Sequence, residues 1–87
     1  MSKIIYDISG QIQGVFDSTQ DLLSNLETNH FKQIGFETNK DNILIINDKE
    51  IKIGITNRIE YSDIEIQSCR LATPGFLIIT YIYEKEI

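Results

Sequence analysis

Apolar and polar residues alternate along most of the chain after residue 42, which is the pattern of strands that bury one face of a sheet. Isoleucine carries most of this alternation, and short polar segments interrupt it at intervals. Because strands that follow each other in sequence tend to lie side by side, the pattern predicts an antiparallel meander. The alternating positions are Ile43, Ile45, Ile51, Ile53, Ile55, Ile64, Ile66, Ile78 and Ile82.

The first third of the chain reads differently. Residues 3–9 alternate as a first strand that ends at Gly10, and residues 11–16 either extend it or pair back on it. A helix is then expected from Ser18 to His30, because Ser18 and Asp21 have the spacing of a capping box. The leucines at positions 22, 23 and 26 would form the apolar side of this helix.

Three polar segments and one Pro-Gly pair predict turns in the second part of the chain. The segment 47–49 separates two apolar runs, so residues 42–55 are the best-defined hairpin. The alternation slips after Ile66, and a bulge at Gln67 or Ser68 would turn Cys69 and Leu71 inward. Residues 74 and 75 suit the centre of a type II turn.

Together these elements predict an α+β fold in a single globular domain, residues 1–87. One N-terminal helix would pack on a five- to six-stranded antiparallel β-meander in the order β-α-β-β-β-β-β. A strongly curled sheet that approaches a small barrel is the alternative. Eighty-seven residues leave room for one hydrophobic core only.

Charge narrows the choice of partner. Thirteen acidic residues against eight basic ones give a net charge of −5, which repels phosphate and disfavours direct binding of nucleic acid. A basic protein that handles nucleic acid is compatible with this charge. No segment has the length of a membrane span or the composition of a signal peptide, and the single Cys69 excludes an internal disulfide. We therefore expect a cytoplasmic protein without membrane contact.

Candidate chemistry is sparse. One histidine, His30, and one cysteine cannot build a His- or Cys-rich metal site or a convincing nucleophile and base pair. Gly10 and Gly14 precede the expected helix but lack the Lys-Ser/Thr pair of a phosphate loop. We therefore predict no catalytic residue, no metal and no cofactor, and the expectation is that the protein is not an enzyme.

No motif in the sequence names a function, so two hypotheses remain open. The first is a small acidic protein-binding module, an inhibitor of the immunity, antitoxin or phage anti-defence type that blocks a basic site on its partner. Its predicted contact residues are Glu60, Tyr61, Asp63 and Glu65, with Asp17 and Asp21 as a second patch. The alternative is a structural or assembly protein, possible as a homodimer, that self-associates through an apolar sheet face or an edge strand. Residues 76–83 would be the seam.

Overall fold

The computed structural model describes residues 3–87, and these residues form an all-β fold of seven antiparallel strands without a helix. The strands follow one another along the chain with short connections, except between the first and the second. Their bounds are β1 (Ile5–Phe16), β2 (His30–Glu37), β3 (Asn42–Ile46), β4 (Lys49–Ile53), β5 (Ile59–Glu65), β6 (Cys69–Leu71) and β7 (Gly75–Glu86).

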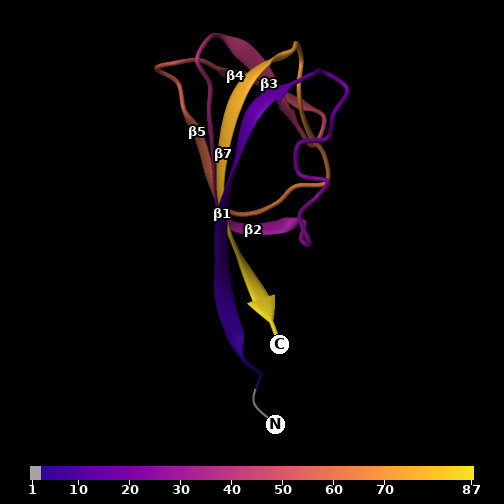
Figure 1. Ribbon diagram of the computed structural model, residues 1–87, viewed down its shortest axis with the longest axis vertical. Helices are drawn as coiled ribbons and strands as arrows, with labels where there is room; N and C mark the ends of the chain where they lie inside the picture. Colours follow the sequence, from indigo (N-terminus) through magenta and orange to yellow (C-terminus); the bar gives the residue numbers. More distant parts are fainter. Residues whose placement is uncertain (1–2) are drawn as a thin grey trace.

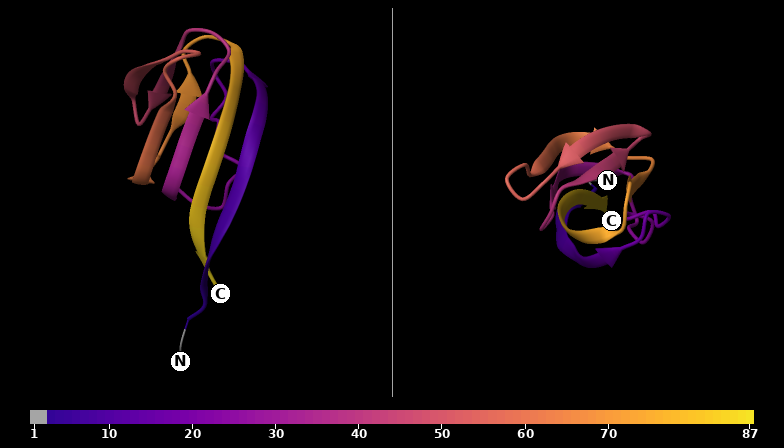
Figure 2. Two further views of the ribbon diagram at one scale, coloured as in Figure 1. Left: turned by 90° about the vertical axis from the view of Figure 1, so that its left-hand side faces the viewer. Right: turned by 90° about the horizontal axis from the view of Figure 1, so that it is seen from above.

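The strands divide into two sheets. The first sheet has four strands in the order β1-β7-β2-β5, and the second sheet has three in the order β4-β3-β6. β1 and β7 pair along their whole length of twelve residues, from Ile5 opposite Glu86 to Phe16 opposite Gly75. The first and the last strand of the chain are therefore neighbours, with β1 at the border of the sheet (Figure 2).

One hydrophobic core lies between the two sheets. Phe31 packs edge-on against Tyr81 and Tyr83, with ring centroids 6.5 Å and 6.4 Å away. The two tyrosines are stacked on each other at 5.9 Å because they lie two residues apart on one strand face. The largest fully buried side chains are Phe31, Phe36, Ile34, Leu44, Leu71, Leu77, Ile79 and Cys69.

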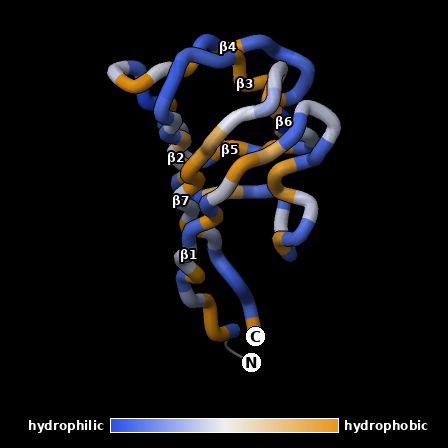
Figure 3. The backbone as a smooth tube through the Cα atoms, turned by 45° about the horizontal axis from the view of Figure 1, so that its top comes forward, coloured by the Kyte–Doolittle hydropathy of each residue, from blue (hydrophilic) through white to orange (hydrophobic). Residues whose placement is uncertain are grey.

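β1 and β7 continue past the other strands as a two-stranded ribbon that carries both termini at its end (Figure 1). The molecule is consequently elongated, 49 Å long against 24 and 21 Å across. The ladder between β7 and β2 covers only residues 78–82 of β7, so the rest of β7 toward the C-terminus pairs with β1 alone. Apolar residues lie at the ends of the ribbon next to both termini (Figure 3).

The prediction of a helix from Ser18 to His30 is wrong: residues 17–29 form a series of turns. The carboxylates of Asp17 and Asp21 start these turns. Asp17 Oδ1 accepts hydrogen bonds from the N–H groups of Thr19 and Gln20. Asp21 Oδ1 accepts one from the N–H of Leu23. The N–H of Leu22, which a helix would direct to Ser18, donates instead to the carbonyl of Cys69 at 2.8 Å.

A short segment rich in Ser, Thr, Asn and Asp has little intrinsic preference for a helix, because these side chains bond to the local backbone. Tertiary contacts then decide the conformation. Leu22 and Leu23 are both buried although they are adjacent, and Leu26 packs against the core from a partly buried position. The leucines were correctly predicted to cover the sheet, but turns place them there.

The predicted meander is wrong as well, since β7 lies between β1 and β2 and does not pair with β6. The hairpin of residues 42–55 is confirmed as the β3–β4 pair, although Ile55 is exposed. Gly75 begins β7, and no glycine among residues 3–87 has a positive φ, so the predicted type II turn at Pro74-Gly75 is not formed. The pairing of the first strand with the last cannot be predicted from local periodicity, because the spacing of apolar residues carries no information about distant partners.

Asn47 holds the corner at which the chain leaves the first sheet for the second. It lies with Asp48 in the two-residue β3–β4 loop, where both residues have positive φ, 50° and 66°, as a type I′ turn requires. Its Oδ1 accepts hydrogen bonds from the N–H groups of Gln67 and Ser68, and its Nδ2 donates to the carbonyl of Glu65. The predicted inward turn of Cys69 and Leu71 is confirmed, and a change of sheet at residues 66–68 produces it.

A second change of periodicity was not predicted. On β2, Phe31 and Ile34 are both fully buried although they are three residues apart. On β5, Tyr61 and Ile64 both pack against the core although they are also three residues apart. The two changes lie at the same level of the ladder, where Asp63 adopts a φ of 52°. Aspartate tolerates this left-handed conformation better than most residues.

Candidate functional site

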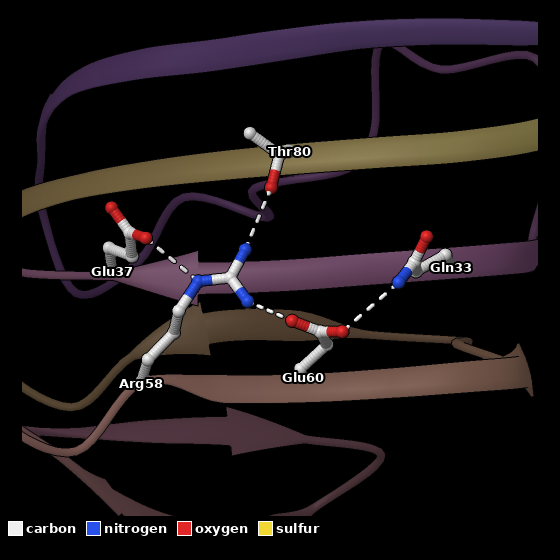
Figure 4. A network of polar contacts seen from close by, with 5 residues as sticks. All are labelled: Gln33, Glu37, Arg58, Glu60 and Thr80. Atoms are coloured by element: carbon white, nitrogen blue, oxygen red, sulfur yellow. Dashed lines mark hydrogen bonds and ion pairs between the residues drawn. The ribbon is translucent and has the colours of Figure 1, made fainter.

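Two polar or exposed regions of the first sheet are candidates for a functional site. One is a cluster of five side chains on its outer face, Gln33, Glu37, Arg58, Glu60 and Thr80, which we call the Arg58 cluster (Figure 4). The other is the free edge of β1.

In the Arg58 cluster every guanidinium nitrogen has a partner. Nε donates to Glu37 Oε1 at 2.8 Å, Nη1 donates to Glu60, and Nη2 donates to Thr80 Oγ1 at 3.3 Å. Gln33 donates to the second oxygen of Glu60 at 3.0 Å. These contacts join β2, β5 and β7 across the sheet, and they use three of the five N–H donors of the guanidinium.

Gly35 is what allows the guanidinium to lie on the sheet. A Cβ built on this glycine would overlap Arg58 Nη2 and would lie 2.8 Å from Arg58 Cζ. The hydrogen bond to Glu60 raises the pKa of Arg58. The pKa of Glu60 is lowered, first by the hydrogen bond from Gln33 and then by Arg58. The cluster borders a shallow groove of about 500 Å³, but its guanidinium is already paired with two carboxylates, so its geometry is that of a cross-strand brace.

The structure separates the predicted acidic contact residues. Glu60 lies on the outer face inside the Arg58 cluster, whereas Tyr61 packs against the core on the inner face. Burial raises the pKa of Tyr61. Asp63 Oδ1 lies 2.8 Å from His30 Nε2 with 86% of its side chain exposed, and Glu65 is exposed near the corner that Asn47 holds.

The predicted second patch has a local role in the turns of residues 17–29. Asp17 accepts three hydrogen bonds from Thr19 and Gln20, of which those from Thr19 contribute most to the lowering of its pKa. Asp21 holds the turn at Leu23. The six residues therefore do not form one continuous acidic surface, although Asp63 and Glu65 remain accessible.

The free edge of β1 is a region that the sequence interpretation missed. β1 pairs with β7 on one side only. The N–H of Ile87 donates to the carbonyl of Ile4, which shows that even-numbered residues of this strand bond toward β7. Since backbone groups alternate along an antiparallel strand, the odd-numbered residues direct their N–H and C=O groups to the free side. These are Ile5, Asp7, Ser9, Gln11, Gln13 and Val15, and all six are exposed.

Exposed apolar side chains gather at the same strand. Of the six large hydrophobic residues that are exposed among residues 3–87, four lie on β1 or immediately before it. They are Ile4, Ile5, Tyr6 and Val15, and Val15 is 76% exposed. The sequence carried one signal of this arrangement, which is that Ile4 and Ile5 are adjacent and cannot both face the core of a one-sided strand.

Gly10 lies in the middle of β1, and the ring of Tyr81 covers its inner face. A Cβ on Gly10 would lie 2.6 Å from Tyr81 Cζ. The tyrosine thus occupies the space that a side chain at position 10 would take. Because Gly10 has no side chain, nothing at this position obstructs the free edge.

Other reactive groups lie apart from both regions. Cys69 is fully buried, and burial raises the pKa of its thiol to about 12. Within residues 3–87 no three His, Cys, Asp or Glu side chains converge as metal ligands. The same part of the chain contains no helix with the length and hydrophobicity to cross a membrane.

Comparison of the chain with known protein families, with curated proteins and with solved structures finds no match.

Proposed function

We propose that this protein is a non-enzymatic protein-binding module of the cytoplasm and that it works as an assembly protein through the free edge of β1. Its partner is a protein, not a nucleic acid or a membrane. The observation that carries the proposal is the coincidence of an unpaired edge twelve residues long with four of the six large hydrophobic side chains that are exposed among residues 3–87.

Natural proteins usually protect the edges of their sheets with proline, bulges, short strands or several charged side chains. β1 contains no proline, pairs with β7 without interruption, and carries Asp7 as its only charge. An edge without these protections is suited to pairing with another strand, in which the main chain provides affinity and the side chains provide selectivity. The ribbon of β1 and β7 adds to this argument, because a two-stranded segment has little stability of its own in water.

The inhibitor hypothesis is the second candidate, and the exposure of Asp63 and Glu65 favours it. An acidic partner with a net charge of −5 would associate quickly with a basic site. The carboxylate of Glu60 is less available to a partner, because Arg58 and Gln33 already hold it. We rank this hypothesis second because Asp63 already lies against His30, and because Asp17 and Asp21 hold the turns of residues 17–29.

The proposed surface can be tested with a photo-reactive amino acid introduced at Gln13, which is exposed on the free edge, and, as a matched control, at Ile55. Ile55 is apolar and 71% exposed, and it lies outside β1 and both sheets. In an extract of the cells that contain the protein, the probe at position 13 should cross-link to protein and the probe at 55 should not. Equal labelling at both positions, or none at position 13, would contradict the proposal.

The inhibitor hypothesis predicts that partner binding depends on acidic side chains. Charge reversal by Asp63→Lys and Glu65→Lys should abolish partner binding if the acids bind a basic site, and it should leave cross-linking at position 13 unchanged if β1 is the binding surface. The salt dependence of binding gives a second criterion, because exposed ion pairs weaken as ionic strength rises.

A further inference from the structure

The free edge of β1 is complementary to itself. When two identical strands pair antiparallel, residues that lie opposite each other share one face of the sheet. If Gly10 of one copy lies opposite Gly10 of another, apolar residues meet apolar residues and polar residues meet polar residues along the whole strand. The opposed residues are Ile4 and Phe16, Ile5 and Val15, Tyr6 and Gly14, Asp7 and Gln13, Ile8 and Ile12, and Ser9 and Gln11.

We propose that two copies of this chain pair edge to edge through β1, with the two-fold axis at Gly10. The two first sheets, each with four strands, then form one sheet of eight strands. This inference rests on the proposed function and specifies its partner as a second copy of the chain. A two-fold contact of this kind uses the same surface on both subunits and closes on itself.

The register follows from the exposed apolar residues at the two ends of β1. Ile5 and Val15 are 59% and 76% exposed on the outer face, and pairing at Gly10 covers each with the other. A shift by two residues would place Val15 opposite Lys3 in one direction and opposite Asp7 in the other. A shift by one residue would bring the inner face of one strand against the outer face of its partner.

The backbone and the charges fit the same register. All six odd-numbered residues of β1 direct their N–H and C=O groups to the free side, and pairing at Gly10 places odd residues opposite odd residues. Each of these pairs can exchange two hydrogen bonds. Within the strand, the register keeps like charges apart, because Asp7 lies opposite the uncharged Gln13. No side chain at position 10 disturbs the axis, where Tyr81 covers the inner face.

Disulfide cross-linking measures the register directly. Ser9→Cys and Gln11→Cys are prepared as separate proteins, since both positions are exposed on the outer face. Pairing at Gly10 places residue 9 opposite residue 11 of the partner, within the Cα separation that a disulfide accepts. After mild oxidation of a mixture, the mixed 9–11 dimer should dominate over the 9–9 and 11–11 dimers. Cys69 does not interfere, because it is buried.

Predominance of 9–9 or of 11–11 would overturn the proposed register, because those products belong to shifts by two residues in either direction. Equal amounts of all three products, or none, would overturn β1 pairing itself.

Val15→Lys tests the pairing without crosslinks. The side chain of Val15 is mostly exposed in the single chain, so the variant should keep its fold, whereas a lysine opposite Ile5 of the partner should raise the dimer dissociation constant at least about tenfold. Ile55→Lys is the matched control and should leave the dissociation constant unchanged in sedimentation equilibrium. Equal dissociation constants for both variants would contradict the proposal.

The failure of this inference can be told apart from the failure of the proposed function. If the pure protein stays monomeric and the photo-probe at Gln13 captures a different protein, β1 is a binding edge and its partner is not a second copy. If the probe captures nothing and the pure protein stays monomeric, both are wrong.

Discussion

Asn47 offers a quantitative test of how the chain passes from the first sheet to the second. Its side chain makes three hydrogen bonds to the backbone of residues 65–68, and its own backbone has a φ of 50°. Three substitutions separate these contributions. Asn47→Asp keeps the acceptor oxygen, Asn47→Gly keeps only the conformational freedom, and Asn47→Ala keeps neither.

The expected losses follow from the contacts. Residue 47 is exposed, so water can partly replace each lost hydrogen bond, and a net value of about 0.5–1 kcal/mol per bond is appropriate. Asn47→Gly should then lower the free energy of unfolding by about 2 kcal/mol, and Asn47→Asp, which loses the donor alone, by about 1 kcal/mol. Asn47→Ala should lose about 3 kcal/mol, because alanine in the left-handed region costs roughly 1 kcal/mol more.

Urea denaturation, monitored by tyrosine fluorescence or circular dichroism, measures these values. An unchanged dependence of the free energy of unfolding on urea concentration checks that the unfolding transition is the same. Asn57→Ala is a suitable control, since Asn57 makes a single side-chain hydrogen bond to the carbonyl of Lys52. The predicted order of stability is Asn, Asp, Gly, Ala. If all three variants at position 47 lie within about 0.5 kcal/mol of the natural chain, the corner is not held by this side chain.

Three further predictions concern other positions. Asp48→Gly should stabilise the chain by about 0.5–1 kcal/mol in the same denaturation assay, because Asp48 has a φ of 66° in a type I′ turn where glycine is preferred; a loss of stability would contradict this turn. Gly35→Ala should lower the free energy of unfolding by about 1–2 kcal/mol, because the added methyl group displaces Arg58. In a double-mutant cycle this loss should vanish in the Arg58→Ala background, and an undiminished loss would place the strain elsewhere. Because burial raises the pKa of Cys69 to about 12, its thiol should resist iodoacetamide at pH 9 until the chain unfolds. Rapid alkylation of the folded chain would contradict this burial. In the unfolded chain the thiol ionises at a lower pH, so the free energy of unfolding should fall as pH rises from about 9 toward 12. This fall should be smaller in Cys69→Ala.

Local patterns predicted local structure well in this chain. The β3–β4 hairpin was found because Asn47 and Asp48 suit a turn between two apolar runs, and the inward Cys69 and Leu71 were found because alternation identifies faces. The helix prediction failed because Asp21 of the capping box and its neighbour Asp17 start isolated turns instead, and because the N–H of Leu22 bonds to the carbonyl of Cys69. Only the folded neighbourhood decides between the two outcomes.

The sheet order failed for a different reason. Pairing of β1 with β7 joins residues about as far apart as the chain permits, and no spacing in the sequence reports it. The candidate site shifted with it, because the predicted seam at residues 76–83 lies inside the first sheet and the free edge belongs to β1 instead. The density of acidic residues suggested Glu60 and Asp63 as contacts for a partner. In the fold, Glu60 pairs with Arg58, which is close in sequence, and Asp63 lies against His30, which is distant in sequence.

The most direct test of edge pairing through β1 is residue-resolved amide hydrogen exchange, measured by NMR at a low and a high protein concentration. Even-numbered amides of β1 bond to β7 and should be protected at both concentrations, whereas Ser9, Gln11 and Gln13 should exchange rapidly when dilute and become protected when concentrated. Fast exchange of these three amides at every concentration would contradict the pairing of two copies through this edge.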